Sequence, residues 1–274
     1  MLLSAKLAPT FDYPALEDFW RSADALGFHS IANYDHFYGL VDPATPTLEG
    51  WTALAAMAAV VRRARVSCLV SSVTYRNPAV LAKMAVTVDH ICGGRLDFGI
   101  GAGWHEAEHR AYGIEFPSAG TRVDMLDEAL TVIRRLWTEG SVTHAGRFYT
   151  LTDALCEPKP VQRPHPPIVI GGEKPKMLRV VARHADEWNA TSVGDPQAWA
   201  QMSARLDDAC REVGRDPAEI RRSAQLFLHP AQDGQVEAQL ARLPEFEALG
   251  CTHAVLSFYQ PPTAAQLQQV AELI

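Results

Sequence analysis

Residues 105–109 read His-Glu-x-x-His, a pattern that binds zinc when it lies on one face of a helix. His105 and His109 are four residues apart, so a helix would direct both imidazoles at one ion, with Glu106 as a general base. Such zinc helices are usually buried, whereas Glu108 and the arginine that follows His109 make this one polar. No later segment supplies a convincing third ligand. We therefore expect no metal at this position.

Two strand-like segments of the sequence end in glycines. Gly101 and Gly103 follow the first, and Gly171 and Gly172 follow the second. Glycines at the start of a helix let backbone N–H groups approach an anion, so the two turns predict a phosphorylated cofactor. The first turn resembles the opening of a dinucleotide fingerprint, but Trp104 stands in place of its last glycine, and we do not expect a Rossmann site. The alternative is that the glycines only form tight turns.

An aspartate and a histidine stand together at the end of another strand-like segment. His36 could donate a proton or hydrogen-bond a ring carbonyl, and Asp35 could orient it or contact a cofactor. Such a pair can also be a helix cap or a hydrogen-bonded core histidine. We expect His36 to act as the acid or base, with Glu106 or Glu108 as the next candidates.

These residues need elements that bring them together, and the sequence alternates strand-like and helix-like segments almost from end to end. Alternation of this kind predicts a parallel sheet. Eight strand–helix units in one chain of 274 residues predict a single (β/α)8 barrel domain over residues 1–274, since such barrels need roughly 250 residues. An open doubly wound sheet is the structural alternative. The strand-like segments are residues 2–9, 30–37, 65–73, 95–101, 167–172, 187–191, 222–230 and 253–260.

A barrel also predicts where the chemistry lies. Catalytic groups stand just after the strands, at the C-terminal face, which is where His36 and both glycine turns occur. The long connection at residues 141–167 links the fourth helix to the fifth strand, so the topology places it on the opposite face. We expect it to form a hairpin with a proline-rich return.

Composition excludes several classes of protein. A net charge of −7 argues against a nucleic-acid surface or a polybasic membrane patch. The sequence has no run of about 18 apolar residues, so it predicts no transmembrane helix. The N-terminus lacks the apolar stretch of a secretory signal. The 5 cysteines are scattered without a C-x-x-C motif, which is typical of buried thiols in a reducing compartment. We expect a cytoplasmic protein that acts on small molecules.

Longer motifs give a resemblance that covers nearly the whole chain. The runs GGRLDFGIGAGWHEAEHRAYGIEFP, LVSSVTYRNPAVLAKMAVTVDHICGGR and PKPVQRPHPPIVIGG resemble the luciferase-like monooxygenase superfamily. Within it, the chain looks like the branch that depends on the deazaflavin coenzyme F420. Relatives often carry asparagine where His105 stands, so the resemblance makes the zinc pattern accidental.

The resemblance implies a (β/α)8 barrel, usually dimeric, with a flavin or deazaflavin in its mouth. It also implies a bulge in the third strand with a non-prolyl cis peptide against the ring, which by position falls at Leu69–Val70. An Asp-His pair after the second strand lies beside the ring, and backbone after the fourth and fifth strands holds the phosphate. The residues expected to contact the cofactor are Asp35, Leu69, Val70, Gly101, Ala102, Gly103, Trp104, Gly171 and Gly172.

The function that this resemblance implies is hydride transfer between coenzyme F420 and a small organic substrate. The alternative within the fold is an FMN-dependent monooxygenase supplied by a separate reductase, and a flavin-binding barrel without catalytic activity is a further alternative. The sugar-phosphate dehydrogenases of the F420 branch carry a glutamate directly after the glycines of the fourth strand and a tryptophan shortly after the Asp-His pair. Here Trp104 and Leu40 stand at those places, which argues against a sugar-phosphate substrate.

Overall fold

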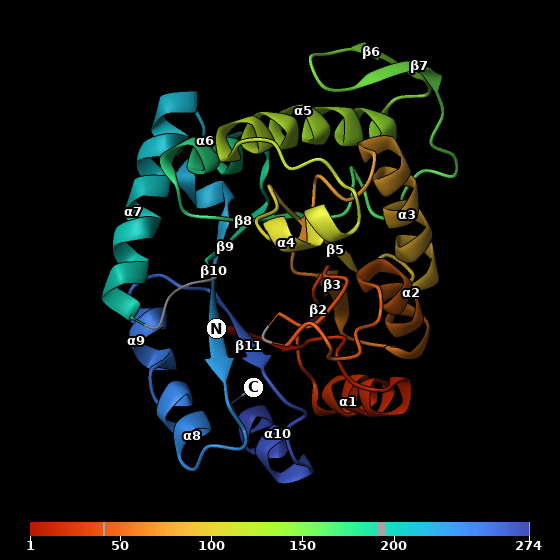
Figure 1. Cartoon of the computed structure of the whole chain (residues 1–274). Helices are drawn as coiled ribbons and strands as arrows, with labels where there is room; N and C mark the ends of the chain where they lie inside the picture. The colour runs from red at the N-terminus through yellow and green to blue at the C-terminus, as the bar shows by residue number, and fades with distance from the viewer. Residues whose placement is uncertain (41, 191–194, 274) are drawn as a thin grey trace.

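Parallel strands close into a barrel in the computed structural model, which describes residues 1–40, 42–190 and 195–273 (Figure 1). The sheet has nine strands in the order β3-β2-β1-β11-β10-β9-β8-β5-β4, and a β3–β5 pairing closes it. Since β3 and β4 are two halves of one interrupted strand, the described residues form an eight-membered barrel, as predicted. The strands are β1 (Leu2–Leu7), β2 (Ser30–Asn33), β3 (Arg65–Cys68), β4 (Ser71–Ser72), β5 (Leu96–Gly101), β8 (Ile168–Gly171), β9 (Glu187–Ala190), β10 (Arg221–Leu228) and β11 (His253–Phe258).

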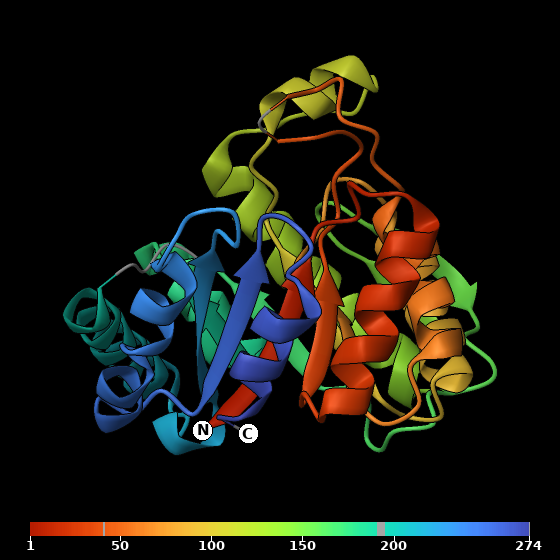
Figure 2. The ribbon, with the colours of Figure 1, turned by 90° about the horizontal axis from the view of Figure 1, so that it is seen from below.

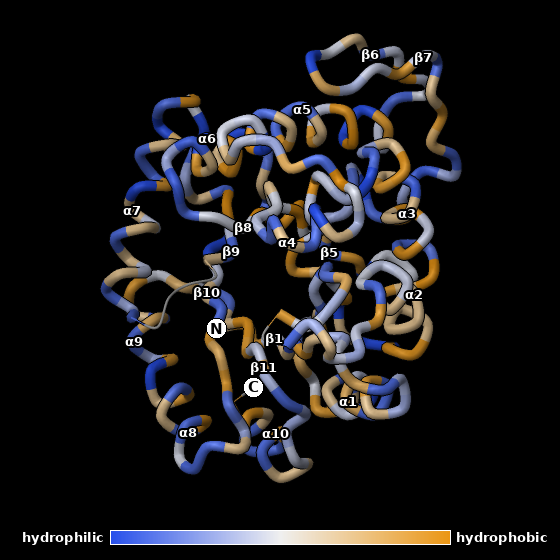
Figure 3. The backbone as a smooth tube through the Cα atoms, viewed as in Figure 1, coloured by the Kyte–Doolittle hydropathy of each residue, from blue (hydrophilic) through white to orange (hydrophobic). Residues whose placement is uncertain are grey.

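Helices follow the strands and surround the barrel (Figure 1). Along the outer helices α5 and α7, hydrophobic and hydrophilic residues alternate, as expected for helices with one face against the barrel (Figure 3). No helix among the described residues is long and apolar enough to span a membrane. The helices are α1 (Tyr13–Leu26), α2 (Gly50–Val60), α3 (Pro78–Ile91), α4 (Glu106–Ala111), α5 (Ala119–Thr138), α6 (Pro175–His184), α7 (Pro196–Val213), α8 (Gln235–Leu240), α9 (Leu243–Ala248) and α10 (Ala264–Ala271), with a 3-10 turn at Pro217–Glu219.

The long connection after α5 forms the predicted hairpin. Strands β6 (Val142–Ala145) and β7 (Thr150–Ala154) pair antiparallel and lie outside the barrel (Figure 1). The return packs under the barrel, where the Gln162 side chain donates to the Leu96 carbonyl at 2.7 Å. Because Leu96 begins β5, the connection lies on the face away from the strands' carboxyl ends, as predicted.

Layers of side chains fill the barrel interior. Ala32, Leu69, Val169 and Val255 form an apolar layer. A polar layer at the opposite end includes Ser4, His253 and Glu187. These groups satisfy one another, because His253 lies 2.6 Å from the Ser4 hydroxyl and 2.8 Å from the Glu187 carboxylate. These two layers of the interior therefore form a packed core.

Two local expectations need correction. Apolar residues at helical spacing after Thr121 predict a helix that begins at residue 122 with Thr121 as its cap. The helix begins instead at Ala119, because the Ser118 hydroxyl accepts from the Thr121 backbone N–H at 3.2 Å. The pattern of residues 236–250 predicts a single helix. The segment forms two short helices instead, and Pro244 occupies the first turn of the second. The end of the strand expected at residues 187–191 and the last residue of the chain lie outside the described residues.

Candidate active site

A cavity of about 1120 Å³ opens at the carboxyl ends of the strands. The loop after β2 and helix α4 rise together above this end, while both termini lie at the other (Figure 2). Parallel barrels place their binding sites on this face. All nine residues expected to contact a cofactor line the cavity, and so does His36; they are Asp35, Leu69, Val70, Gly101, Ala102, Gly103, Trp104, Gly171 and Gly172.

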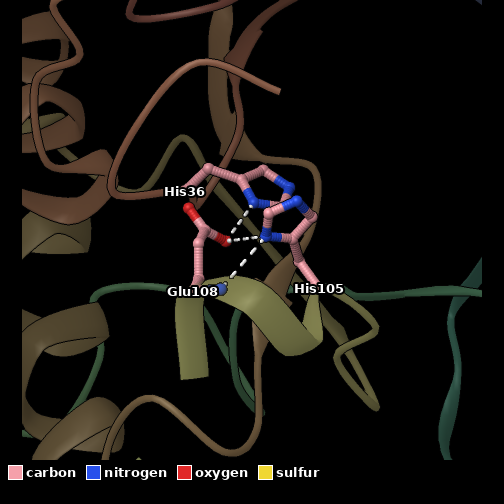
Figure 4. Close-up of side chains that lie close together, drawn as sticks. All are labelled: His36, His105 and Glu108. Atoms are coloured by element: carbon pink, nitrogen blue, oxygen red, sulfur yellow. Dashed lines mark hydrogen bonds and ion pairs between the residues drawn. The ribbon is translucent and has the colours of Figure 1, made fainter. Parts of the chain in front are cut away.

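Glu108 of α4 is the centre of a hydrogen-bond cluster beside this cavity (Figure 4). Its side chain has no exposed surface, so its oxygens need partners from the protein. Oε2 accepts from the Tyr75 hydroxyl at 2.6 Å and lies 2.7 Å from His36 Nδ1. Oε1 accepts from the Phe37 backbone N–H at 2.6 Å. The cluster joins the loops after β2 and β4 to α4.

These hydrogen bonds fix the charge of Glu108 and the tautomer of His36. Burial alone would raise the pKa of Glu108, but the hydrogen bonds from His36, Tyr75 and the Phe37 N–H outweigh it and hold the pKa at about 2. An ionised carboxylate can only accept, so His36 Nδ1 must be the donor. In neutral His36 the other nitrogen, Nε2, is then a proton acceptor. Within the described part of the chain, Nε2 has no hydrogen-bond partner.

The structure separates the three expected proton-transfer residues. His36 lines the cavity, with aromatic rings of Tyr34 at 4.9 Å and Trp104 at 5.7 Å from its own ring. Glu108 lies behind it as its partner. Glu106 does not reach the cavity, because its side chain is 61% exposed and pairs with Arg110 at 3.0 Å. The polar helix that carries both glutamates directs one of them inward and the other into solvent.

Asp35 orients the bulged strand rather than His36. Both of its oxygens accept from the Arg76 guanidinium, at 2.6 and 2.9 Å, and Oδ2 also accepts from the Ser72 backbone N–H at 3.3 Å. Arg76 in turn contacts Glu49. Since Asp35 is only 2% exposed, its carboxylate contributes mainly by holding β4 against the loop after β2.

The predicted cis peptide bond at Leu69–Val70 is confirmed. It lies between β3 and β4, and the Val70 side chain stands against the glycines of the neighbouring strands. A methyl group added to Gly101 would come within 2.9 Å of the Val70 side chain, whereas one added to Gly171 would meet it at an ordinary 3.7 Å. The bulge, β5 and β8 therefore form one continuous surface on the cavity floor.

The structural requirement for glycine differs among the positions of the two turns. Gly103 has a φ of +75°, and a methyl group there would lie 2.3 Å from the Ser72 hydroxyl. The fold therefore requires glycine at this position. Gly172 has a φ of +124° and would meet Met177. Gly171 has no positive φ and no close neighbour, so neither the backbone conformation nor the packing of the protein requires glycine there. A ligand that fills the space beside Gly171 would require it.

Positive charge gathers beside these turns. Arg122, Lys174 and Lys176 line the cavity. The Arg122 guanidinium donates to the Gly103 carbonyl at 3.2 Å and lies 3.8 Å from the Phe116 ring. Helix α6 begins directly after the second turn without a side-chain cap on its first N–H groups. Open N–H groups and cations at one place suit a phosphate.

The histidines of the His-Glu-x-x-His pattern do not face a common point. His109 is buried, and its two nitrogens contact the Thr74 hydroxyl at 2.6 Å and the His105 carbonyl at 2.8 Å. His105 instead joins His36 at Glu108, and ligand atoms of these three lie within 4.8 Å of one another (Figure 4). A metal there would displace the hydrogen bonds that Glu108 already accepts.

We therefore predict that the purified protein holds no stoichiometric zinc and that chelators leave its activity unchanged. Elemental analysis of protein prepared without added metal, before and after treatment with a chelator, measures this directly. One tightly bound zinc per chain would contradict the prediction.

Three further residues belong to the site beyond those expected to transfer protons or to contact the cofactor. Tyr75 and Arg76 follow the third strand, a position that marks them as candidates, but only the fold shows that they bind Glu108 and Asp35. Lys6 lines the cavity from β1. Its signal in the sequence is a charged residue inside an apolar strand.

Relatives identify the family. Residues 2–270 match the family model of the luciferase-like monooxygenases. The chain is 30% identical over 226 residues to an F420-dependent glucose-6-phosphate dehydrogenase of Microbacterium testaceum, covering 81% of this chain and 66% of that one. It is 33% identical over 222 residues to the pyrimidine monooxygenase RutA of Bradyrhizobium, covering 78% and 60%. The matches span about half to two thirds of the length of the curated relatives.

Solved structures agree on the fold. An F420-dependent secondary alcohol dehydrogenase in complex with an F420–acetone adduct has a TM-score of 0.85 at 21% identity, covering 100% of this chain and 98% of that one. The EDTA monooxygenase of Chelativorans has a TM-score of 0.80 at 14% identity, covering 100% and 93%. The barrel, the bulged third strand and the family match over residues 2–270 agree, and the chain belongs to the luciferase-like monooxygenase family.

Proposed function

We propose that this protein is an oxidoreductase that passes a hydride between coenzyme F420 and a small organic substrate. The observation that carries the proposal is His36, which lines the cavity with Nδ1 fixed on Glu108 and with Nε2 left without a partner among the described residues. A hydride transfer to or from oxygen-bearing carbon needs a proton donor or acceptor beside the reacting atoms, and His36 supplies one.

The cavity fits a phosphorylated ring cofactor. The apolar surface at Leu69–Val70 offers a platform for a ring, and Gly171 leaves room beside Val70 that a methyl group would fill. Backbone at both glycine turns, together with Arg122 and Lys174, would hold a phosphate. When bound, the deazaflavin ring would supply or accept the hydride.

The protein's own part in the reaction follows from the cluster at Glu108. Hydride transfer leaves a charge imbalance that a proton must cancel, and His36 Nε2 exchanges that proton at the cavity wall. The Glu108 carboxylate, ionised because its pKa is about 2, stabilises the protonated imidazole. Tyr34 and Trp104 enclose the imidazole from two sides and limit its contact with water.

Two of the similar proteins support a second candidate function, that of a monooxygenase. RutA and the EDTA monooxygenase are named as monooxygenases, and an FMN-dependent monooxygenase supplied with reduced flavin by a separate reductase would use the same barrel. The two functions differ at one ring atom, because a deazaflavin lacks N5 and does not activate oxygen as a flavin does.

Separate titrations of cofactor-free protein with F420 and with FMN test the proposal. We expect F420 to bind more tightly than FMN, measured by the change in cofactor absorbance or fluorescence. Tighter binding of FMN would favour the monooxygenase, and binding of neither would remove both functions.

Replacing Gly171 with alanine is expected to weaken F420 binding roughly tenfold without lowering thermal stability, since a methyl group overfills a packed contact at about 1–3 kcal/mol. The fold itself tolerates the change because the nearest atoms would lie 3.7 Å away. Gly140→Ala is a matched control, since a methyl group there meets nothing within 4 Å. Unchanged F420 affinity in Gly171→Ala would remove this glycine from the binding surface.

A further inference from the structure

A buried lysine stands on the cavity floor without a carboxylate partner. Lys6 is only 6% exposed and lines the cavity from β1. Its ammonium donates to the Gln225 side-chain oxygen at 3.3 Å, and the Tyr34 ring centre lies 5.8 Å away. No carboxylate of the described residues lies within 4.0 Å of the ammonium. Buried charges in proteins are normally paired, so this one calls for a ligand.

Two neighbours of Lys6, Gln225 and Ser257, can each add a hydrogen-bond donor. Gln225 turns its oxygen toward the ammonium, which leaves its NH2 group as a second donor. Ser257 is opposite Lys6 in the β1–β11 register and adds a hydroxyl to the same cavity wall. Burial lowers the pKa of Lys6 to about 8, so the ammonium form prevails at neutral pH. Together these groups form a cradle for a negatively charged oxygen.

The wall beside this cradle is apolar. Phe227 is opposite Ser257 in the β10–β11 register, and its ring lies 5.5 Å from the ring of Tyr259. Both line the cavity, as do Phe11 and Leu40. A ligand held by Lys6 would therefore place an apolar body against these side chains.

The cradle is separate from the glycine turns. In the order of the barrel, two strands, β2 and β3, separate β1 from β5, and three strands, β11, β10 and β9, separate β1 from β8. A phosphate at Gly101–Gly103 and Gly171–Gly172 would thus lie across the cavity from Lys6. Lys6, Gln225 and Ser257 lie on β1, β10 and β11. A ring stacked on Leu69–Val70 would therefore leave this part of the cavity surface uncovered.

We propose that Lys6, with Gln225 and Ser257, binds a negatively charged oxygen of the substrate, and that the substrates are apolar organic molecules bearing a carboxylate. The assignment of this anion to the substrate rests on the proposed function, whereas the binding of an anion by Lys6 does not. A ring carbonyl of the cofactor is the other source of such an oxygen, and the experiment separates the two.

The test uses 2-naphthoate and its neutral analogue 2-naphthamide on cofactor-free protein at pH 7, with affinities measured by calorimetry. Hydrogen bonds to a charged group contribute enough to predict a preference for the carboxylate of about tenfold or more. Lys6→Met should abolish this preference, and Lys6→Arg should retain part of it. Lys83→Met, which removes an exposed lysine on α3, should leave it unchanged. Lys6→Gln is a second neutral variant if the methionine variant does not fold.

Each outcome decides one point. Equal or absent binding of the two probes by the wild-type protein, or a preference that survives in Lys6→Met, would overturn the proposal. If Lys6→Met instead loses affinity for F420 as strongly as for 2-naphthoate, the oxygen belongs to the cofactor ring and the substrate assignment is wrong. If the wild-type protein binds neither F420 nor FMN but shows the Lys6-dependent preference, the proposed function fails and the anion site stands.

Discussion

His36→Ala should lose turnover by roughly 100-fold or more, the scale of general acid–base catalysis. His36 and Tyr75 are the members of the Glu108 cluster that line the cavity. The Tyr75 hydroxyl already donates its proton to Glu108 at 2.6 Å, so alanine at position 36 removes the group that has an open proton acceptor. F420 affinity should fall less than turnover, because the glycine turns and Arg122 would hold the cofactor independently of His36. Steady-state kinetics and a parallel F420 titration of the same variant measure both quantities.

His90→Ala is the matched control for this variant. His90 is an exposed histidine on α3 whose ring lies 2.9 Å from the Lys159 carbonyl, away from the cavity, so its removal should leave turnover unchanged. A loss confined to F420 affinity would make His36 a binding residue. Wild-type turnover in His36→Ala would move proton transfer to Glu108 or water.

Glu108→Gln should also reduce turnover by roughly 100-fold or more while leaving F420 affinity nearly unchanged. The amide has a donor where the carboxylate only accepts, so His36 would turn from the Nδ1–H to the Nε2–H tautomer and lose its acceptor toward the cavity. In the serine-protease triad, the same change beside a catalytic histidine costs about 10⁴ in turnover by this mechanism. Nitrogen-15 NMR of the histidines reports the tautomer directly.

Glu106→Gln separates this effect from a general change to α4. Its side chain is exposed and pairs with Arg110, away from the hydrogen bonds of His36, so the variant should keep wild-type turnover and the Nδ1–H tautomer of His36. If Glu108→Gln lowers turnover with the tautomer unchanged, Glu108 acts in some other way than by orienting His36.

Much of the fold could be predicted from the sequence because its signals are local. Alternating segments of helical and strand periodicity predict eight units, and the hairpin after α5 follows from its position between a helix and the next strand. The prediction was wrong where two local signals compete. Ser118 starts α5 three residues earlier than Thr121 suggests, and Pro244 divides a segment whose apolar spacing is helical throughout.

Only the part of the site that directly follows the strands could be predicted from the sequence. Position after a strand is enough to mark His36 and the glycine turns, and the family resemblance places the cis bond at Leu69–Val70. The pairing of His36 with Glu108 joins residues 72 positions apart, and no local pattern records it. For the same reason Asp35 is predicted beside His36, yet it binds Arg76, 41 positions away.

A crystal structure of the protein with F420 tests the central claim most directly. We expect the deazaflavin ring to contact Leu69–Val70, the phosphate to lie at the Gly101–Gly103 and Gly171–Gly172 turns, and His36 Nε2 to face the open side of the ring. F420 bound outside this cavity, or a ring that makes no contact with Leu69–Val70, would contradict the account.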